Sequence, residues 1–470
     1  MSMKIMAPAV DPANGKLLVE PMDEQAMGEA LLRRLPAQGK QIKELSLATA
    51  RGTTFRGARE RPRQRDIGDP RAVGWTYLIA SGEPARDRIV EAIEPLARRR
   101  GMKDPAAPLE LGASEDGWFD WMLDHYWRVE EPPPPHYVLI VANPDQVPFH
   151  FQAMLDSVAA VGRLAFADVG EIAAYVEKVL RLEDDSGQSC GNEAVVFATD
   201  HGPRDPTHYS RRYMAEPLAK QIGQRGFETA MLAGEDATRD GLMAALQGRR
   251  PALLYTASHG AAKPNGSQEE RERVNGAIVC QGDLSAGRLE LLGAADVPEE
   301  PVLEGGVLFQ FACFGYGTPA ESDYNHWLGK DGFNAERDFV AALPRKLLAH
   351  PRGPIAYIGH VDLAWLHAFT NPRAPDLIEA WHPRMAPFSS AVRTCLEPQP
   401  VGLAMQDMGK RFDVGNAELA SIFDRQRRPT PPDAAELRRG LVSTFITRSD
   451  AQNYMLLGDP AVYVRIDDGA

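Results

Sequence analysis

The sequence predicts an α/β protein built on a doubly wound, mostly parallel sheet. Short apolar runs of strand character alternate with longer amphipathic runs of helical period along most of the chain. Strands that are separated by helices pair in parallel, with helices covering both faces of the sheet. A length of 470 residues exceeds one ordinary core and predicts two or more subdomains.

The predicted strands are apolar runs bounded by glycine, proline or polar residues. They are "GWTYLIA" (74–80), "HYVLIVAN" (136–143), "EAVVFATD" (193–200), "PALLYTASHG" (251–260), "GGVLFQFAC" (305–313), "GPIAYIGHV" (353–361) and the strand pair "YMLLGDPAVYVRI" (454–466). Amphipathic period and end signals predict helices between them. The helices cover 83–101, 117–127, 170–184, 208–226 and 237–248, and another follows the segment 424–433.

The chain divides into three regions. Residues 1–74 are rich in charge and lack a clear period, so we expect an irregular N-terminal region. The alternation of strands and helices begins near residue 75. The polar break "DDSGQSCGN" (184–192) then separates a first α/β subdomain, 75–185, from a second, 186–470.

Charge and hydropathy exclude several classes of protein. The net charge of −13 argues against nucleic acid as the main partner. The sequence does not open on a basic stretch with an apolar core, and it has no run of 18 apolar residues. We therefore expect neither a signal peptide nor a membrane partner, and a cytoplasmic location.

The four cysteines, Cys190, Cys280, Cys313 and Cys395, are far apart and form no CxxC pair. This spacing argues against a disulfide framework or a zinc site. We expect no metal and no cofactor from the residues alone.

Several reactive side chains follow predicted strands directly, and open parallel sheets bind ligands at the carboxyl ends of their strands. Asp200 follows one strand, His259 and Gly260 follow another, and Cys313 follows a third. If these strand ends meet, His259 can act as the base for a Cys313 thiol nucleophile. The backbone N–H groups of Gly260 and Cys313 can then hold an oxyanion, and Asp200 can orient the imidazole. The alternatives are a buried structural cysteine and an ordinary His-Gly turn.

At "LLYTASHG" (253–260) and "VLFQFACFGYG" (307–317) the sequence resembles the caspase-like (clan CD) cysteine peptidases, which include caspases, gingipains and bacterial CHAT proteases. The gingipain-like branch is the most similar. Four further segments match in the family's order, and together they span roughly residues 75–470. They are "HYVLIVANPDQVP", "VGRLAFADVGEIAAYVEKVLRLE", "PRGPIAYIGHVDLAW" and "YMLLGDPAVYVR".

The resemblance implies a caspase-like or gingipain-like fold with two side-by-side subdomains, of which the second is catalytic. It assigns Cys313 as the nucleophile and His259 as the general base and acid. The role of a carboxylate that supports the histidine carries to Asp200, in "FATDHGPR". Trp365 falls where an aromatic residue walls the pocket for the substrate residue before the scissile bond (P1).

One departure from the family concerns specificity. Arginine-specific gingipains place an aspartate on the helix after that Gly-Pro, where it pairs with a substrate arginine. Arg211 stands there in this sequence, followed by Arg212. A guanidinium pairs with a carboxylate, so we expect cleavage after Asp or Glu. The alternative is that both arginines are solvated helix charges, which leaves a basic or other P1 preference open.

The sequence thus predicts a cytoplasmic cysteine endopeptidase acting on a protein or peptide substrate. The resemblance implies a role in bacterial defence or regulated cell death. The alternatives are a non-catalytic caspase-like binding module and a different thiol enzyme. We expect the charged segments 261–276 and 424–433 to be surface loops, either of which could serve self-cleavage or bind a regulatory partner. Calcium is implied by family analogy only, with no ligand role assigned to Asp323 or Asp331.

Overall fold

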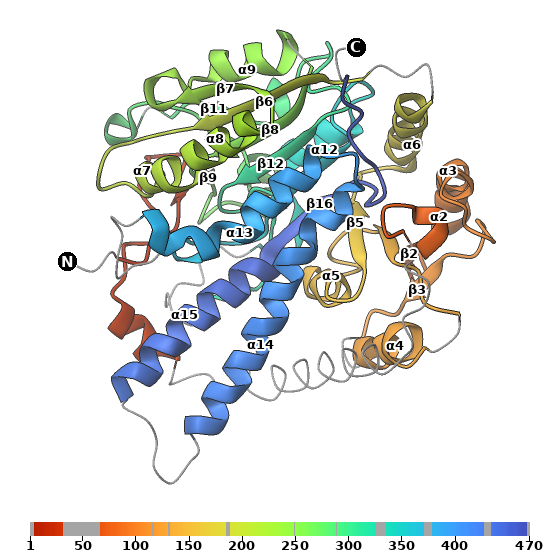
Figure 1. The fold of residues 1–470 in the computed structure, drawn as a ribbon, viewed down its shortest axis with the longest axis horizontal. Coiled ribbons are helices and arrows are strands. Elements are labelled where there is room, and N and C mark those ends of the chain that lie inside the picture. The colour runs from red at the N-terminus through yellow and green to blue at the C-terminus, as the bar shows by residue number, and fades with distance from the viewer. Residues whose placement is uncertain are drawn as a thin grey trace.

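A ten-stranded sheet lies at the centre of the computed structural model (Figure 1). The residues that the structure describes are 4–31, 66–114, 117–129, 132–184, 189–248, 250–287, 289–324, 335–370, 378–426 and 434–467. In spatial order the strands are β3 (Leu109–Leu111), β2 (Trp75–Ala80), β4 (Tyr137–Val141), β5 (Ala160–Leu164), β16 (Tyr454–Leu457), β15 (Ala356–His360), β12 (Val307–Phe311), β8 (Pro251–Ala257), β6 (Gly191–Ala198) and β7 (Glu228–Ala233).

The sheet consists of two parallel halves that meet at one antiparallel junction. Strands β2 to β5 pair in parallel in one half. Strands β6, β7, β8, β12 and β15 pair in parallel in the other. Strand β16 joins them, since it is parallel to β5 and antiparallel to β15. The predicted α/β fold with a large, mostly parallel sheet is confirmed.

Helices cover both faces of the sheet, as the alternation of side chains along a strand requires. Tyr137 and Leu139 of β4 join the core that contains α3 and α6, whereas Val138 and Ile140 join the core that contains α4 and α5. The principal helices are α3 (Arg86–Arg99), α4 (Trp118–Met122), α5 (Phe149–Asp156), α6 (Val169–Glu183), α8 (Glu216–Gln224), α9 (Arg239–Gly248), α12 (Ala342–Ala349), α13 (Ile378–Cys395), α14 (Gln406–Gln426) and α15 (Ala434–Asn453). Among the described helices, none combines the length and the apolar character that crossing a membrane requires.

Strand β5 was not predicted from the sequence, because Arg163 lies near its end. This arginine is fully buried and its guanidinium donates to the Gln152 side chain and to the carbonyls of Ala142 and Val147. Buried charge is tolerated where every donor direction finds an acceptor. Strand β7 and the helices α13 and α14 were not predicted either.

Two expectations from the sequence are wrong. The second strand expected within 454–466 does not form: after the turn at Gly458 the carbonyls of Pro460 and Val462 accept from Gly402 and Val401. Ile466 makes an isolated bridge with Cys190. The expected loop at 261–276 contains the helix α10 (Gln268–Val274), which a capping box between Ser267 and Glu270 begins. Residues 427–433 of the other expected loop, and Asp331, lie outside the described residues.

Part of the region expected to be irregular forms a small second sheet. Its strands, in order, are β1 (Ala9–Val10), β9 (Gly260–Ala261), β10 (Ile278–Val279) and β11 (Leu291–Leu292). Strand β1 pairs in parallel with β9, so N-terminal residues lie directly beside the segment that follows His259.

A buried ion-pair network fixes the turn after the central strand β16 to α3 and α6. The guanidinium of Arg100 bonds Asp459 Oδ2 at 2.7 Å and both carboxylate oxygens of Glu183 at 2.6 and 2.8 Å. The other oxygen of Asp459 accepts from Trp75 Nε1 at 2.9 Å. The Asp459 side chain is fully buried, and this explains an aspartate in the "GDP" turn.

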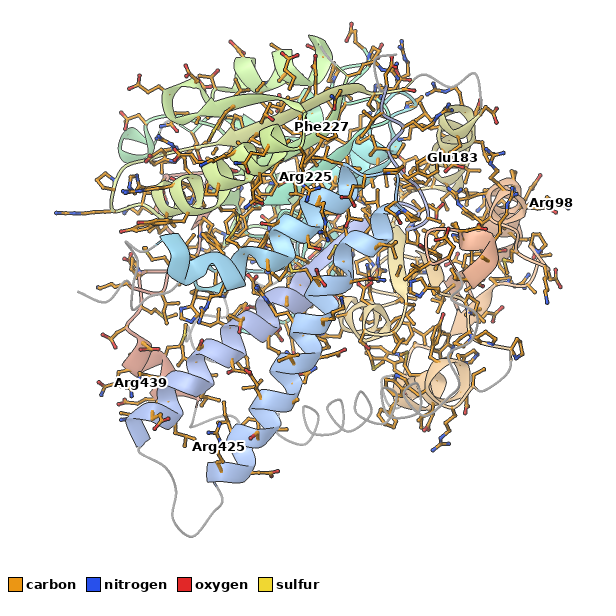
Figure 2. All side chains as sticks on the ribbon, viewed as in Figure 1. Arg98, Glu183, Arg225, Phe227, Arg425 and Arg439 are labelled. Carbon is orange, nitrogen blue, oxygen red and sulfur yellow. The ribbon has the colours of Figure 1, made fainter. Side chains whose placement is uncertain are left out.

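We expect Arg100→Met to destabilise the protein by about 3–5 kcal/mol, because it leaves two buried carboxylates without their partner. Arg98→Met is the matched control. Figure 2 shows Arg98 at the surface, where it pairs with Glu94 and is 68% exposed, so its loss costs less than about 1 kcal/mol. Urea unfolding midpoints of both variants measure the difference, and equal shifts would contradict the structural role of Arg100.

Candidate catalytic site

Cys313 and His259 lie at the ends of neighbouring parallel strands. Phe311 of β12 is paired with Ala257 of β8, so continuing each strand by two residues brings these side chains to the same level. Gly260 packs directly on the backbone of Cys313, since a Cβ at Gly260 would lie 1.8 Å from Cys313 O and 2.9 Å from Cys313 N. Only glycine fits there, because any side chain would collide with the Cys313 backbone.

The imidazole of His259 is held by a carboxylate on one side only. Its Nε2 lies 2.9 and 3.0 Å from the two oxygens of Asp205. Its Nδ1 is buried and has no hydrogen-bond partner among the residues that the structure describes. A carboxylate accepts a hydrogen, so this contact favours the Nε2–H tautomer and leaves the Nδ1 lone pair free to accept a proton.

Asp205 is fixed in place as the N-cap of the helix α7 (Pro206–Ser210). Its Oδ1 accepts from the backbone N–H of Thr207 at 2.9 Å and from Thr207 Oγ1 at 2.5 Å. Burial raises the pKa of this carboxyl, but the charge and hydrogen bond of His259 and the bonds from Thr207 outweigh it and lower the pKa to about 2. Asp205 is therefore ionised at neutral pH and can orient and stabilise an imidazolium.

Asp200 does not contact His259, contrary to the expectation from the sequence. Its carboxylate accepts from Gly202 N at 2.9 Å, contacts His208 Nδ1 at 3.0 Å and pairs with Arg211 Nη1 at 2.8 Å. The carboxylate that contacts His259 belongs to Asp205, five residues further along the chain. Asp200 instead ties the strand end to the helical segment that carries Arg211.

The two residues expected to form the substrate pocket have other contacts as well. Arg211 lies in a helical turn (Arg211–Ala215) and bonds Glu216 through Nε at 2.9 Å, in addition to Asp200. Trp365 is fully buried after β15, where its ring packs on Tyr324 at 5.2 Å. Arg211 thus already faces two carboxylates, which reduces the positive field that it can offer to a substrate.

The Cys313 thiol is fully buried. Burial raises the pKa of the Cys313 thiol well above its ordinary value, although a hydrogen bond from Ala364 N at 3.2 Å opposes the shift. The carboxylates of Asp362 and Asp450 raise it further. In this closed arrangement the sulfur is protonated, so attack requires a base at hand.

The backbone is strained around this sulfur. Among the described residues other than glycine, φ is positive at Leu303, Phe314 and Asp362. Phe314 directly follows Cys313, and its N–H donates to the carbonyl of Asp362 at 2.7 Å. Side chains with positive φ persist where the surroundings enforce them, commonly at functional sites.

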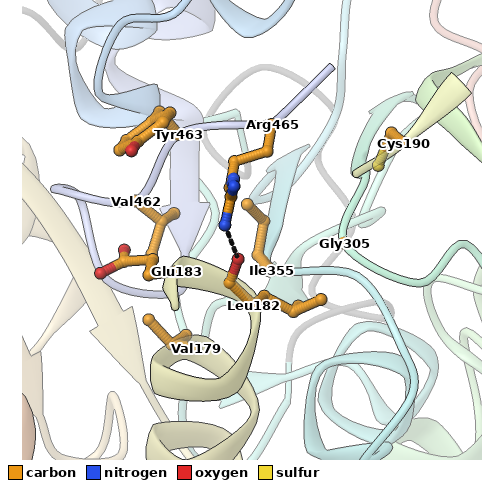
Figure 3. A pocket seen from close by; sticks show the side chains of 9 residues that line it. All are labelled: Val179, Leu182, Glu183, Cys190, Gly305, Ile355, Val462, Tyr463 and Arg465. Carbon is orange, nitrogen blue, oxygen red and sulfur yellow. Dashed lines mark hydrogen bonds between the residues drawn. The ribbon is translucent and has the colours of Figure 1, made fainter. Parts of the chain in front are cut away.

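The other three cysteines are structural. Cys190, Cys280 and Cys395 are buried, and burial raises the pKa of each thiol to about 12. Cys190 lines a pocket between α6 and the end of the chain, in which Arg465 donates to the Leu182 carbonyl (Figure 3). The space there is about 10 Å³, no more than one water occupies.

Three residues of the site could hold a metal ion. They are His201, Asp205 and His259. Each offers one ligand atom, and these three atoms lie within 4.8 Å of one another. Burial, and then the charge of His259, lower the pKa of His201 to about 4, so it is neutral at pH 7. Asp323 contacts His150 Nε2 at 3.6 Å, and no role as a calcium ligand is assigned to it.

Comparisons with known proteins assign no function to this chain. No protein-family model matches the chain, and no curated protein matches it. A solved structure described as "Structure of Protease" is 12% identical with a TM-score of 0.48, and the match covers 83% of this chain and 78% of that one.

Proposed function

We propose that this protein is a cysteine endopeptidase in which Cys313 is the nucleophile, His259 the general base and acid, and Asp205 the carboxylate that orients the imidazole. The single observation that supports this most is the contact of His259 Nε2 with Asp205, which leaves the buried Nδ1 without a partner beside the strand end of Cys313. A cysteine, an imidazole and an ionised carboxylate in this order form an acyl-transfer triad.

The chemistry follows from the positions of these groups. His259 Nδ1 accepts the thiol proton as the sulfur bonds the scissile carbonyl carbon, and the N–H groups of Gly260 and Cys313 hold the oxyanion. Collapse of this intermediate breaks the C–N bond, and the imidazolium returns the proton to the leaving amine. A water molecule deprotonated by Nδ1 then hydrolyses the thioester and restores the thiol.

Asp or Glu before the scissile bond is the substrate preference that Arg211 supports. Because Asp200 and Glu216 already pair with Arg211, an acidic side chain must compete with them. The alternative is a preference for a basic or other P1 residue, because the carboxylates of Asp200 and Glu216 can themselves pair with a cationic side chain.

A panel of fluorogenic peptides that differ only in the P1 residue tests the activity and the preference. We expect hydrolysis of the Asp or Glu peptide at least about tenfold faster than of the Leu peptide, and faster still than of the Arg peptide. Arg211→Ala should lower that ratio, whereas the matched control Arg212→Ala should not. Faster cleavage after Arg or Lys would contradict the assigned preference.

A further inference from the structure

The segment Ile5–Val10 is buried against the candidate site although it lies some 250 residues away in sequence. All six residues are buried, and Ala9 and Val10 are fully so. The chain then turns back along this segment, so that Ile5 forms an antiparallel bridge with Met22. In Figure 1 the N-terminal residues, in red, run near β9 toward α15.

The segment binds the site through its backbone in the manner of an extended peptide. Alternate carbonyls of an extended chain point to the same side, so they can meet a row of donors. Three such carbonyls each accept from a backbone N–H of the site: Met6 O from Leu366 at 3.0 Å, Pro8 O from Gly260 at 2.8 Å and Val10 O from Ala262 at 3.1 Å. This is addition of a strand to the open edge of β9.

The middle contact coincides with the proposed oxyanion donor. Gly260 N–H, which the mechanism needs for the scissile carbonyl, is occupied by the carbonyl of Pro8. Leu366, which bonds Met6, directly follows Trp365, the residue expected to wall the P1 pocket. The register therefore places Pro8 at the P1 position and Ala9 after the scissile bond.

On the basis of the proposed function, we propose that Ile5–Val10 occupies the peptide-binding cleft in place of a substrate and blocks the peptidase in cis. The same cleft takes substrates as extended strands along β9, with small apolar residues flanking P1 as Ala7 and Ala9 do here. The full burial of Cys313 agrees with a closed site. Displacement of the segment frees the Gly260 N–H and opens the cleft.

Two ways of releasing the segment test this inference. Ala9→Asp places a carboxylate at a fully buried position of β1, and Ala13→Asp makes the same change at an exposed turn. Independently, a protease recognition sequence inserted between Ala13 and Asn14 allows the folded chain to be cut after purification. The readouts are the rate of Cys313 alkylation by iodoacetamide, followed by mass spectrometry, and hydrolysis of the best peptide of the panel.

We expect Ala9→Asp and the cut protein to show both rates raised about tenfold or more, and Ala13→Asp to match the wild type. A synthetic peptide of residues 4–12 should then inhibit competitively. Unchanged rates after cutting, with that peptide inert, would overturn the inference. Cys190, Cys280 and Cys395 report unfolding: if they react in Ala9→Asp, the cut protein decides.

The two proposals fail in distinguishable ways. A wild type that hydrolyses peptides as fast as the cut protein overturns the block and leaves the peptidase standing. A cut protein whose Cys313 alkylates faster while no peptide is hydrolysed supports the blocking contact and removes the peptidase.

Discussion

Cys313→Ala is expected to lower kcat/KM for the best peptide by at least about 10⁴-fold, because it removes the sulfur that forms the acyl intermediate. The loss should appear both in the wild type and in the Ala9→Asp background, where the cleft is open. Alanine keeps most of the packing at this buried position, so the denaturation midpoint should change little.

Cys280→Ala is the matched control for that experiment. Cys280 is as fully buried as Cys313, but its thiol contacts the carbonyl of Ile278. Its replacement should leave hydrolysis within about twofold of the starting protein. Retention of activity in Cys313→Ala would show that another nucleophile does the chemistry.

Asp205→Asn is expected to lower kcat by about 10²- to 10⁴-fold with little change in KM. An amide at this position cannot stabilise the imidazolium, and it can donate to Nε2 and so hold the proton on Nδ1, the atom that must accept it. Asparagine is as good an N-cap as aspartate, so helix α7 keeps its first turn and stability is preserved. The effect therefore isolates the orientation of His259.

Asp200→Asn is the control for this second prediction. It compares Asp205, the carboxylate that contacts His259 in the structure, with Asp200, the carboxylate that the family resemblance assigned. Its carboxylate contacts His208 and Arg211 rather than His259, so we expect less than about a tenfold loss, seen mainly in KM for acidic peptides. Michaelis–Menten curves for both variants decide. A larger fall in kcat for Asp200→Asn than for Asp205→Asn would contradict the assigned triad.

The sequence was informative where one local pattern determines the structure. The apolar runs before His259 and Cys313 predicted two strands, and both strands form as neighbours in the sheet. The capping box Ser267–Glu270 is also a local pattern, but the many charges around it favoured a loop over helix α10. The position of Asp205 as an N-cap is a local pattern of the same kind, because Asp-Pro-Thr is a typical helix start.

Other features depend on contacts between distant residues, which a single sequence does not reveal. Strand β1 has two residues and exists only because β9 offers it an open edge. Strand β5 carries a buried arginine whose acceptors come from three separate positions. The choice between Asp200 and Asp205 likewise depends on the turn at Gly202, where φ is +108°.

Covalent capture by a peptidyl chloromethylketone, read by peptide mapping, tests whether Cys313 is the nucleophile of a peptidase. The compound should carry the P1 residue that the panel prefers, and the protein should carry Ala9→Asp so that the cleft is open. We expect one adduct per chain, on Cys313, that is absent in His259→Ala and suppressed by excess substrate. Peptide hydrolysis that persists with Cys313 unmodified, or an adduct on another residue, would contradict it.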